Sequence, residues 1–367
     1  MALRKSLLYG CGDIISTKME NVLVSVVIPA FNAENYIQDC VHATINQTYR
    51  NIEVIIVDDG SEDSTLQVCR ELASEDTRIR ILSRTNNGVS TARNEGIDAA
   101  KGRYIVFFDA DDYPEKTLIE EYIRAIDGWK DKTVSLIATG MYFDNYFNKH
   151  VGNKDVVLEV ARGYIKGEDY LLSRNSAAML SWLKLFNFVT NKCYDLDYIK
   201  EHHIRFDKNI HIGEDLKFNL DYIEDREGSI GFINSPLYHY VKRTNNSLSI
   251  SYHNNDLEDT KYIYRRYINW ESAQEGATED NILVLKGIYI YDWVSRLTAI
   301  YQEHCRCREF AYLKKKLKCE IRSCEFQRML KEIYKGKKIS TLRYVCLRTG
   351  IFEVFYFFRG IYQILKG

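Results

Sequence analysis

Three short apolar runs in the first third of the chain each end in a polar cluster. Helical patterns separate the runs, and within each run the apolar residues do not alternate with polar ones. This order predicts a mainly parallel sheet covered by helices on both faces, in which ligands bind beyond the carboxyl ends of the strands. The polar clusters are therefore expected to form one ligand site. In chain order, each run with its cluster is 22–28 with 29–34, 52–57 with 58–63, and 104–108 with 109–112.

Length, composition and charge fit a folded protein with more than one part. At roughly 100–200 residues per domain, 367 residues predict two domains, or one large domain with an appendage. A hydrophobic fraction of 46% and a charged fraction of 28% are typical of a folded chain. The net charge of −1 and the acidic clusters argue against a nucleic-acid partner. The 9 cysteines lack zinc-site spacing, which favours reduced thiols in the cytoplasm.

The cluster at 109–112 places Asp109, Asp111 and Asp112 directly after an apolar run. Three carboxylates so close together repel one another, and a divalent cation relieves that repulsion. Oxygen ligands suit Mg²⁺ or Mn²⁺, and such an ion can neutralise a diphosphate as it leaves. The alternative is an acidic turn with Asp112 near the start of a helix, whose first turn contains Pro114.

Two further clusters indicate a nucleotide ligand. Asp59 follows the second run, where a carboxylate can accept hydrogen bonds from a base N–H or from ribose hydroxyls. Arg93 follows Asn87-Gly88 near the start of a predicted helix, and an arginine there suits a phosphate. Each feature also has a purely structural interpretation, which is a strand-to-helix turn for Asp59 and a surface arginine for Arg93.

An acidic pair, Glu214-Asp215, lies about one hundred residues after the cluster of three aspartates. Either carboxylate could take a proton from the hydroxyl group of an acceptor molecule. The alternative is a pair of acids at the N-terminus of a helix, where the helix dipole stabilises negative charge. The pair alone therefore leaves both interpretations open.

Taken together and in this order, the segments resemble the family 2 glycosyltransferases, which have the GT-A fold. The resemblance covers about residues 22–250 and is most specific over 22–120. Each segment is ambiguous alone, whereas the ordered set with its approximate spacing is specific. The segments that carry the resemblance are 24–32, 57–61, 87–90, 92–94, 108–112 and 213–215.

The resemblance also divides the chain. It implies an α/β GT-A catalytic domain with a mainly parallel sheet, made of a nucleotide-sugar-binding half and an acceptor half. A disordered N-terminal extension is expected before this domain, and a helical, basic and aromatic region after it. The extension is 1–20, the two halves are 21–125 and 126–250, and the helical region is 251–367.

One group of residues is implied by the resemblance to surround the donor. Asp59 is similar to the residue that reads uracil, which implies a UDP-sugar, and Arg93 is similar to the arginine near the diphosphate. Asp109 is expected near the ribose and Asp112 near the donor sugar. The other donor-binding residues that the resemblance implies are Pro29, Ala30, Phe31, Glu34, Asn87, Ala110, Arg243 and Ser247.

A second group is implied by the resemblance to carry the chemistry. Asp111 is expected to bind Mn²⁺ or Mg²⁺, with His239 as a further metal ligand. Asp215 is similar to the general base of the family, and Glu214 precedes it in the usual acidic pair. A base that activates a hydroxyl for a single displacement at the anomeric carbon implies inversion.

The function expected from these motifs is transfer of a sugar from a UDP-sugar to a hydroxyl of a saccharide or lipid-linked acceptor, in cell-surface polysaccharide synthesis. A sugar nucleotidyltransferase is disfavoured because 29–35 contains neither Gly nor Lys. A processive synthase is disfavoured because the sequence has no Gln-X-X-Arg-Trp segment and no apolar run long enough to span a membrane. A non-catalytic scaffold subunit that binds nucleotide sugars stays open.

The C-terminal region is basic and then aromatic. Residues 311–338 contain ten Lys or Arg against three Glu, and the stretch 352–365 is rich in Phe, Tyr and Ile. A basic segment followed by an apolar aromatic helix fits an anionic membrane surface, which predicts a peripheral protein at the inner face of the cell membrane. The alternative is a helical appendage that packs on the catalytic domain or on a second copy in a homodimer.

Overall fold

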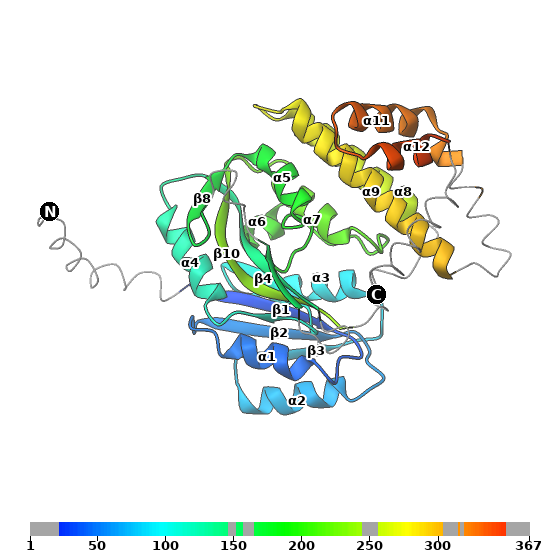
Figure 1. Cartoon of the computed structure of the whole chain (residues 1–367). Helices are drawn as coiled ribbons and strands as arrows, with labels where there is room; N and C mark the ends of the chain where they lie inside the picture. Colours follow the sequence, from blue (N-terminus) through cyan, green and yellow to red (C-terminus); the bar gives the residue numbers. More distant parts are fainter. Residues whose placement is uncertain are drawn as a thin grey trace, which may run out of the picture. The chain divides into compact units, whose positions relative to one another are not determined.

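The computed structural model describes residues 22–145, 152–156, 165–243, 256–303, 315 and 319–349 (Figure 1). The chain divides into two compact units. The sheet unit comprises the described residues within 1–173, 187–208 and 214–243. The helical unit comprises those within 174–186, 209–213 and 244–367. Two short segments of the predicted catalytic stretch, 174–186 and 209–213, thus group with the C-terminal helices.

The sheet unit is built on one mixed sheet with the strand order β3-β2-β1-β4-β9-β6-β10-β5. Strands β1 to β4 pair in parallel, β9 is antiparallel to both of its neighbours, and β10 is parallel to β6. The predicted α/β class with a mainly parallel sheet is therefore confirmed. The strands are β1 Val24–Ala30, β2 Ile52–Asp58, β3 Ile79–Ser83, β4 Tyr104–Phe107, β5 Tyr113–Pro114, β6 Val134–Asn145, β7 Gly152–Val156, β8 Asp169–Leu172, β9 Lys192–Asp195 and β10 Ser229–Lys242.

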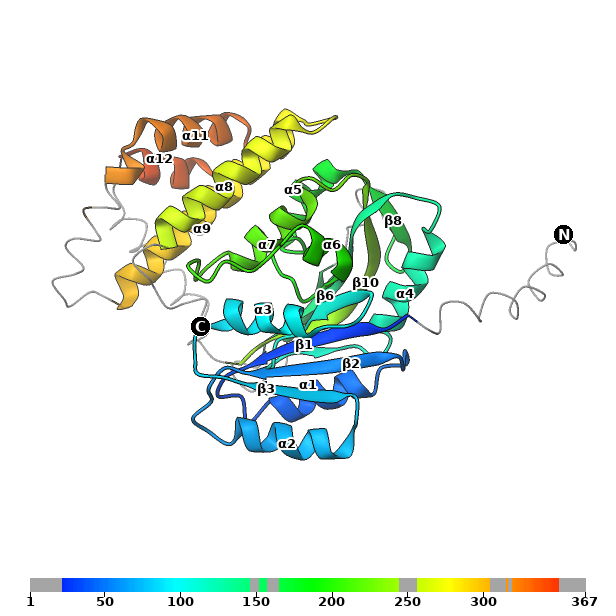
Figure 2. The ribbon, with the colours of Figure 1, turned by 180° about the vertical axis from the view of Figure 1, so that it is seen from behind.

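Helices cover both faces of the parallel part of the sheet. Helices α1 and α2 lie against one face and α3 against the other (Figures 1 and 2), and every residue of β1 and β2 is buried. Gly96 allows α3 to approach β1, since a Cβ there would lie 2.3 Å from the Val27 side chain. The helices of this unit are α1 Ile37–Ile45, α2 Thr65–Glu75, α3 Val89–Ala99, α4 Leu118–Gly128, α6 Leu196–Glu201 and α7 Glu214–Ile223.

The segment after the aspartate cluster differs from the prediction. Pro114 was expected in the first turn of a helix, but Tyr113–Pro114 form the short strand β5, and α4 begins at Leu118. Proline is tolerated in β5 because this strand is at the edge of the sheet, where a missing N–H leaves no ladder bond unmade. Pro114 pairs with Tyr238 of β10, so the cluster 109–112 is tied to that strand.

The helical unit contains long helices packed on buried aromatic side chains. Helices α8 Asp256–Ala273 and α9 Glu279–Glu303 lie side by side, with α11 Cys324–Lys335 and α12 Thr341–Thr349 beside them (Figure 2). Tyr267 and Trp293 are almost completely buried. The short elements η3 Arg174–Ser176 and α5 Ala177–Trp182 belong to the same unit, and the Tyr267 hydroxyl lies 3.0 Å from the Ser181 hydroxyl.

Among the described helices, none is both long and apolar enough to span a bilayer. The aromatic stretch 352–365, the N-terminal extension 1–20 and Ser247 lie outside the described residues. The predictions made for these segments therefore stay predictions. The helical character expected of 251–367 is confirmed where the chain is described.

Candidate active site

Arg93 joins the two acidic motifs that the sequence singled out. Its Nη2 donates to Asp109 Oδ1 at 2.8 Å, and its Nη1 donates to Asp215 Oδ1 at 2.7 Å, across 122 residues of sequence. Glu214 Oε1 lies 3.7 Å from the same Nη1. Helix α3, the loop after β4 and the start of α7 therefore meet at one buried guanidinium group.

The surroundings of Arg93 stabilise its charged form. Burial by itself disfavours the charged form, but the charges of Asp215, Asp109 and Glu214 outweigh that effect and raise the pKa of the guanidinium above its ordinary value. The Phe206 ring lies 5.2 Å from the guanidinium carbon. Arg93 was predicted to contact a diphosphate, and in this structure both of its terminal nitrogens bind carboxylates. Its role toward a phosphate therefore stays a prediction.

Glu214 and Asp215 form the first residues of α7, as one of the two interpretations of the sequence expected. Asp215 accepts a second hydrogen bond, from the Val189 N–H to Oδ2 at 3.2 Å. Desolvation raises the pKa of Asp215, and Arg93 acts against that rise. Desolvation and then the Asp215 charge raise the pKa of Glu214 to about 7. This pair can therefore take up a proton near neutral pH.

Strand β10 holds the aspartate cluster in place. The Asp109 N–H donates to the Tyr238 hydroxyl at 3.0 Å, and the Val241 N–H donates to Asp112 Oδ1 at 2.7 Å. Arg243 donates to the carbonyl of Asp111. Two backbone groups and one side chain of the loop are thus fixed by β10 and the residue after it, which lie about 130 residues further along the chain.

Burial and neighbouring carboxylates raise the pKa of Asp111 and of Asp112. Asp112 is 3% exposed, and desolvation followed by the charges of Asp111 and Asp109 raises its pKa well above the usual value. Its Oδ2 is buried and has no hydrogen-bond partner among the described residues. Asp111 is exposed at the rim of the loop, and its pKa is also raised, by desolvation and then by Asp109. A bound cation would reduce the repulsion between these carboxylates.

These carboxylates suit a divalent cation that is also coordinated by a bound ligand. Within the described ranges no three His, Cys, Asp or Glu side chains converge as a metal site of their own. Mg²⁺ is nevertheless commonly held by one or two carboxylates together with substrate phosphates, and Mn²⁺ accepts the same oxygen ligands. The exposed Asp111, beside two further carboxylates, suits this second arrangement.

His239 has other partners than a metal. Its Nδ1 lies 2.7 Å from Asp144 Oδ2 and its Nε2 lies 2.9 Å from Glu115 Oε1. The imidazole is stacked between the rings of Tyr113 and Tyr142, with centroid distances of 4.3 and 4.4 Å. Both ring nitrogens are engaged, so metal binding by His239 would require one of these hydrogen bonds to break. Metal binding by His239 therefore stays a prediction.

Asp59 shapes the turn that precedes α3. Its two carboxylate oxygens accept the N–H groups of Asn87 at 3.0 Å and of Gly88 at 2.8 Å, and Arg84 Nε lies 3.2 Å away. Gly88 has a φ of 88°, a conformation that glycine adopts without strain. The sequence prediction that Asp59 reads uracil is not tested by this geometry, which shows a carboxylate already bonded to the backbone.

Other predicted donor residues that the structure describes lie at the same edge of the sheet. Pro29 and Ala30 end β1, and the next residue, Phe31, is 45% exposed although it is large and apolar. Glu34 accepts the N–H of Ser64 at 2.8 Å, which ties this loop to the start of α2. Arg243 lies over the Tyr36 ring at 4.5 Å. An exposed aromatic ring here is available for stacking on a nucleobase.

Two cations beside the predicted residues were not anticipated from the sequence. Arg84 pairs with Asp59, as described above. Lys192 is fully buried on β9, where desolvation lowers its pKa to about 7 and the charge of Asp215 opposes that fall. The one sequence feature that could have indicated Lys192 is its place in a run that continues with Cys193 and Tyr194. Such a run is expected of a buried strand.

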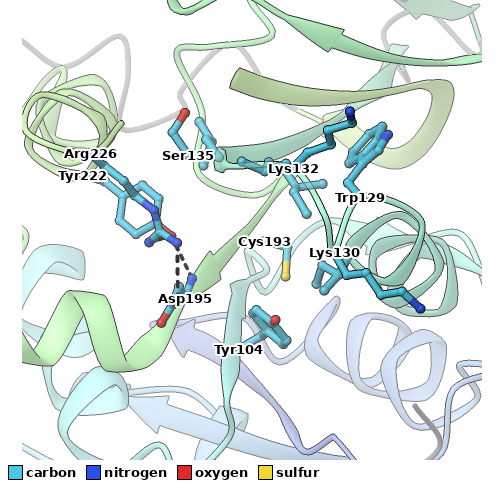
Figure 3. Close-up of a pocket in the computed structure, with 13 residues that line it drawn as sticks. Tyr104, Trp129, Lys130, Lys132, Ser135, Cys193, Asp195, Tyr222 and Arg226 are labelled. Carbon is cyan, nitrogen blue, oxygen red and sulfur yellow. Dashed lines mark hydrogen bonds and ion pairs between the residues drawn. The ribbon is translucent and has the colours of Figure 1, made fainter. Parts of the chain in front are cut away.

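A separate cavity of about 190 Å³ lies at the opposite end of the strands (Figure 3). Tyr104, which lines it, is the first residue of β4, whereas Asp109 lies two residues beyond the end of that strand. Trp129 and Lys132 line another side. Asp195 and Arg226 form an ion pair of 3.3 Å in its wall. The cavity is therefore distinct from the acidic site.

Comparison with known sequences places the chain in a family. The model described as Glycosyl transferase family 2 matches residues 25–193. An uncharacterized glycosyltransferase of Haemophilus influenzae is 31% identical over 69% of this chain and 75% of its own length. The chain belongs to glycosyltransferase family 2, as the motifs predicted.

Other relatives are matched over a smaller share of their length. The uncharacterized glycosyltransferase EpsJ of Bacillus subtilis is 29% identical over 63% of this chain and 64% of its own length. The hyaluronan synthase of Pasteurella multocida is 31% identical over 73% of this chain and 27% of its own length. The chain thus spans less than two thirds of these two relatives.

Comparison with solved structures identifies the fold. The crystal structure of TarS 1-349 of S. aureus in complex with UDP-GlcNAc superposes with a TM-score of 0.65 at 19% sequence identity. The match covers 89% of this chain and 88% of that chain. The predicted GT-A fold is therefore confirmed.

Proposed function

We propose that this protein transfers a glycosyl group from a UDP-sugar to a hydroxyl of a saccharide or lipid-linked acceptor, with inversion, in the synthesis of a cell-surface polysaccharide. Family membership and the acidic edge of the sheet support the transferase activity. The UDP-GlcNAc in the TarS complex supports the class of donor. The observation that carries the proposal is the Arg93 bridge between Asp109 and Asp215, since it brings the donor motif and a base to one place.

The reaction starts from the ionised carboxylate of Asp215. Its carboxylate takes the proton of the acceptor hydroxyl while that oxygen forms a bond to the anomeric carbon. The bond from the anomeric carbon to the diphosphate oxygen breaks, and its electron pair leaves with UDP. Burial raises the pKa of Asp215 toward the range in which a base works at neutral pH, and Arg93 keeps the ionised form accessible.

The departing diphosphate requires positive charge. A bound Mg²⁺ or Mn²⁺, held by Asp111, would supply this charge. Asp112 is fixed by the Val241 N–H and its second oxygen is unpartnered in the described structure, so it can accept a hydrogen bond from a donor hydroxyl. Phe31 is exposed at the end of β1, where it can stack on the uracil ring.

The test is turnover of a panel of UDP-, GDP- and CDP-sugars by the wild type and by Asp215→Asn, with Mn²⁺, Mg²⁺ or EDTA. We expect UDP release from one UDP-sugar, loss of turnover in EDTA, and a fall of roughly 10²–10⁴-fold in kcat for Asp215→Asn with unchanged donor affinity. Asp98→Asn is the matched control, because Asp98 lies on α3 with its side chain 64% exposed. Binding of a UDP-sugar without turnover under any condition would instead favour a scaffold subunit.

We further propose that the protein works at the inner face of the cell membrane. The exposed side chains of Arg328, Lys331 and Lys335 lie along α11, while Phe326 and Leu330 of the same helix are buried. A basic helix face suits anionic lipid headgroups. Flotation with anionic vesicles should decrease for Arg328→Glu/Lys331→Glu/Lys335→Glu and for a chain lacking 340–367. Equal flotation of all three proteins would argue against the membrane proposal.

A further inference from the structure

Lys192 is a buried cation that the proposed chemistry does not use. It is the first residue of β9, and its side chain has no exposed surface. Its Nζ donates to the Phe188 carbonyl and, at 2.8 Å, to Asn191 Oδ1. A buried lysine is costly to keep charged, so its partners indicate what its charge is for.

The Phe188 carbonyl belongs to the peptide group whose N–H is that of Val189. That N–H donates to Asp215 Oδ2 at 3.2 Å. The ammonium of Lys192 and the carboxylate of Asp215 therefore lie at opposite ends of one peptide group. A peptide dipole is favourable in this orientation at both ends, since its carbonyl faces a cation and its N–H faces an anion.

We propose that Lys192 is a positioning residue for the base, which orients Asp215 and keeps it ionised through the peptide group between Phe188 and Val189. The inference rests on the proposed function, in which Asp215 is the base. A cation at the carbonyl end polarises the peptide and strengthens the hydrogen bond at the N–H end. Lys192 thereby acts on the carboxylate without touching it.

The charges around Asp215 show why a second cation matters. Arg93 faces it from α3, Glu214 from α7, Asp109 from the loop after β4, and Lys192 from β9. Three carboxylates are thus opposed by two cations. Desolvation raises the pKa of Asp215 most, while Arg93, the Val189 N–H and Lys192 lower it. Removal of Lys192 would leave Arg93 as the one cation of this group.

A purely structural role for Lys192 makes a different prediction. In that case the lysine would only satisfy the Phe188 carbonyl and Asn191 Oδ1. Asn219 Nδ2 also donates to this carbonyl at 3.1 Å, so a neutral side chain at 192 leaves it bonded. The protein should therefore fold with Met at 192, and a purely structural role would leave the pH dependence of kcat unchanged.

The experiment compares Lys192→Met and Lys192→Gln with the wild type and with Lys200→Met. Lys200 is a matched control because its Nζ also donates to a backbone carbonyl, that of Ala100 at 2.7 Å, but away from Asp215. The measurements are kcat against pH, the donor Kd, and the thermal midpoint. Lys192→Gln provides a second neutral variant if Lys192→Met folds poorly.

The charge-based role predicts a higher pKa for Asp215 in both neutral variants. The acidic limb of kcat should move to higher pH by about one unit, so that kcat falls roughly tenfold at pH values below the limb while donor Kd is unchanged. Lys200→Met should match the wild type. An unmoved limb in a folded Lys192 variant, with wild-type turnover intact, overturns this inference and leaves the proposed function standing. A wild type that turns over no sugar donor overturns both.

Discussion

Each unit of the molecule buries acidic side chains, and the two units treat them differently. In the sheet unit, Asp215 is bonded to Arg93, which lies 122 residues away in sequence. In the helical unit, Glu271 is fully buried and accepts a hydrogen bond from Asn281 at 2.9 Å, only 10 residues away. Desolvation raises the pKa of Asp215 and raises that of Glu271 to about 7.

The difference lies in the partners. Strand ends bring charged side chains from distant segments to one edge of the sheet, whereas Glu271 on α8 meets a neutral amide from the start of α9. A buried acid with a raised pKa is therefore not in itself a sign of function. What separates the two regions is the convergence of cations and several carboxylates at one end of the strands.

The largest expected effect follows from removal of the central cation. Arg93→Met leaves Asp109, Glu214 and Asp215 without their shared partner in a largely buried place. We expect the free energy of unfolding to fall by about 3–5 kcal/mol at pH 7, because an uncompensated buried charge is costly. Transferase activity should be lost as well. Urea unfolding of the purified variant measures the stability change.

Two further variants make the Arg93 prediction specific. Arg93→Met combined with Asp215→Asn should recover part of the lost stability, because one unpaired charge is removed. Arg205→Met is a surface control: its pair with Asp98 is 2.8 Å long and side chains are 34% and 64% exposed, so a loss within about 1 kcal/mol is expected. An equal loss in Arg93→Met and Arg205→Met would erase the contrast between buried and exposed pairs.

The strands and the loops that end them could be predicted because their signals are local. A run such as 52–57 and the cluster after it are recognisable within a dozen residues, and β2 spans Ile52–Asp58 in the structure. The motifs also gave the family and the GT-A fold correctly. Local periodicity therefore sufficed for the parallel half of the sheet and for the edge at which the predicted site residues lie.

The features that sequence analysis missed depend on distant partners. Strand β9 pairs with β4 and β6, so the burial of Lys192 depends on chain segments that local patterns do not connect. The hydrogen bonds of His239 with Glu115 and Asp144 span 124 and 95 residues. Pro114 was assigned to a helix because its pairing with Tyr238 lies equally far away. Residue types identified the chemistry, and topology decided which groups meet.

The second prediction concerns Glu271 and pH. The pKa of Glu271 is about 7 in the folded chain, against 4.5 for an ordinary glutamate. Between these pH values Glu271 holds a proton in the folded state that it has released in the unfolded state. The contribution of Glu271 to the free energy of unfolding therefore falls as pH rises through this window and is constant outside it. Glu271→Gln cannot ionise, and its amide oxygen can still accept from Asn281. The variant should gain on the order of 3 kcal/mol over the wild type between pH 5 and pH 8.

Tryptophan fluorescence in urea at the two pH values measures this gain, since Trp182, Trp270 and Trp293 lie in the helical unit. Transferase activity of Glu271→Gln at neutral pH should stay at the wild-type level. A stability difference that does not change between pH 5 and pH 8 would contradict the desolvated state of Glu271. Loss of activity would contradict the assignment of Glu271 as a buried acid without a role in the reaction.

The smallest effect is expected at Asp59, which shares features with the functional acid Asp215 and with the structural acid Glu271. Asp59 is at the edge of the sheet where the predicted site residues lie, yet its oxygens accept the N–H groups of Asn87 and Gly88. In Asp59→Asn one amide N–H₂ must face a backbone N–H, which should lower stability by about 1–2 kcal/mol. Because the turn leads into α3, donor affinity should weaken as well.

The manner of that weakening separates two roles of Asp59. A carboxylate that only shapes the turn predicts that Kd rises by the same factor for UDP and for CDP, and this is the outcome that the bonded geometry favours. A carboxylate that also reads the base predicts a larger loss for UDP, because uracil has an N3–H to donate and cytosine has none. Calorimetric titration of both nucleotides into wild type and Asp59→Asn decides between them. An unequal loss would place Asp59 with the functional acids, beside Asp215, and an equal loss would place it with Glu271.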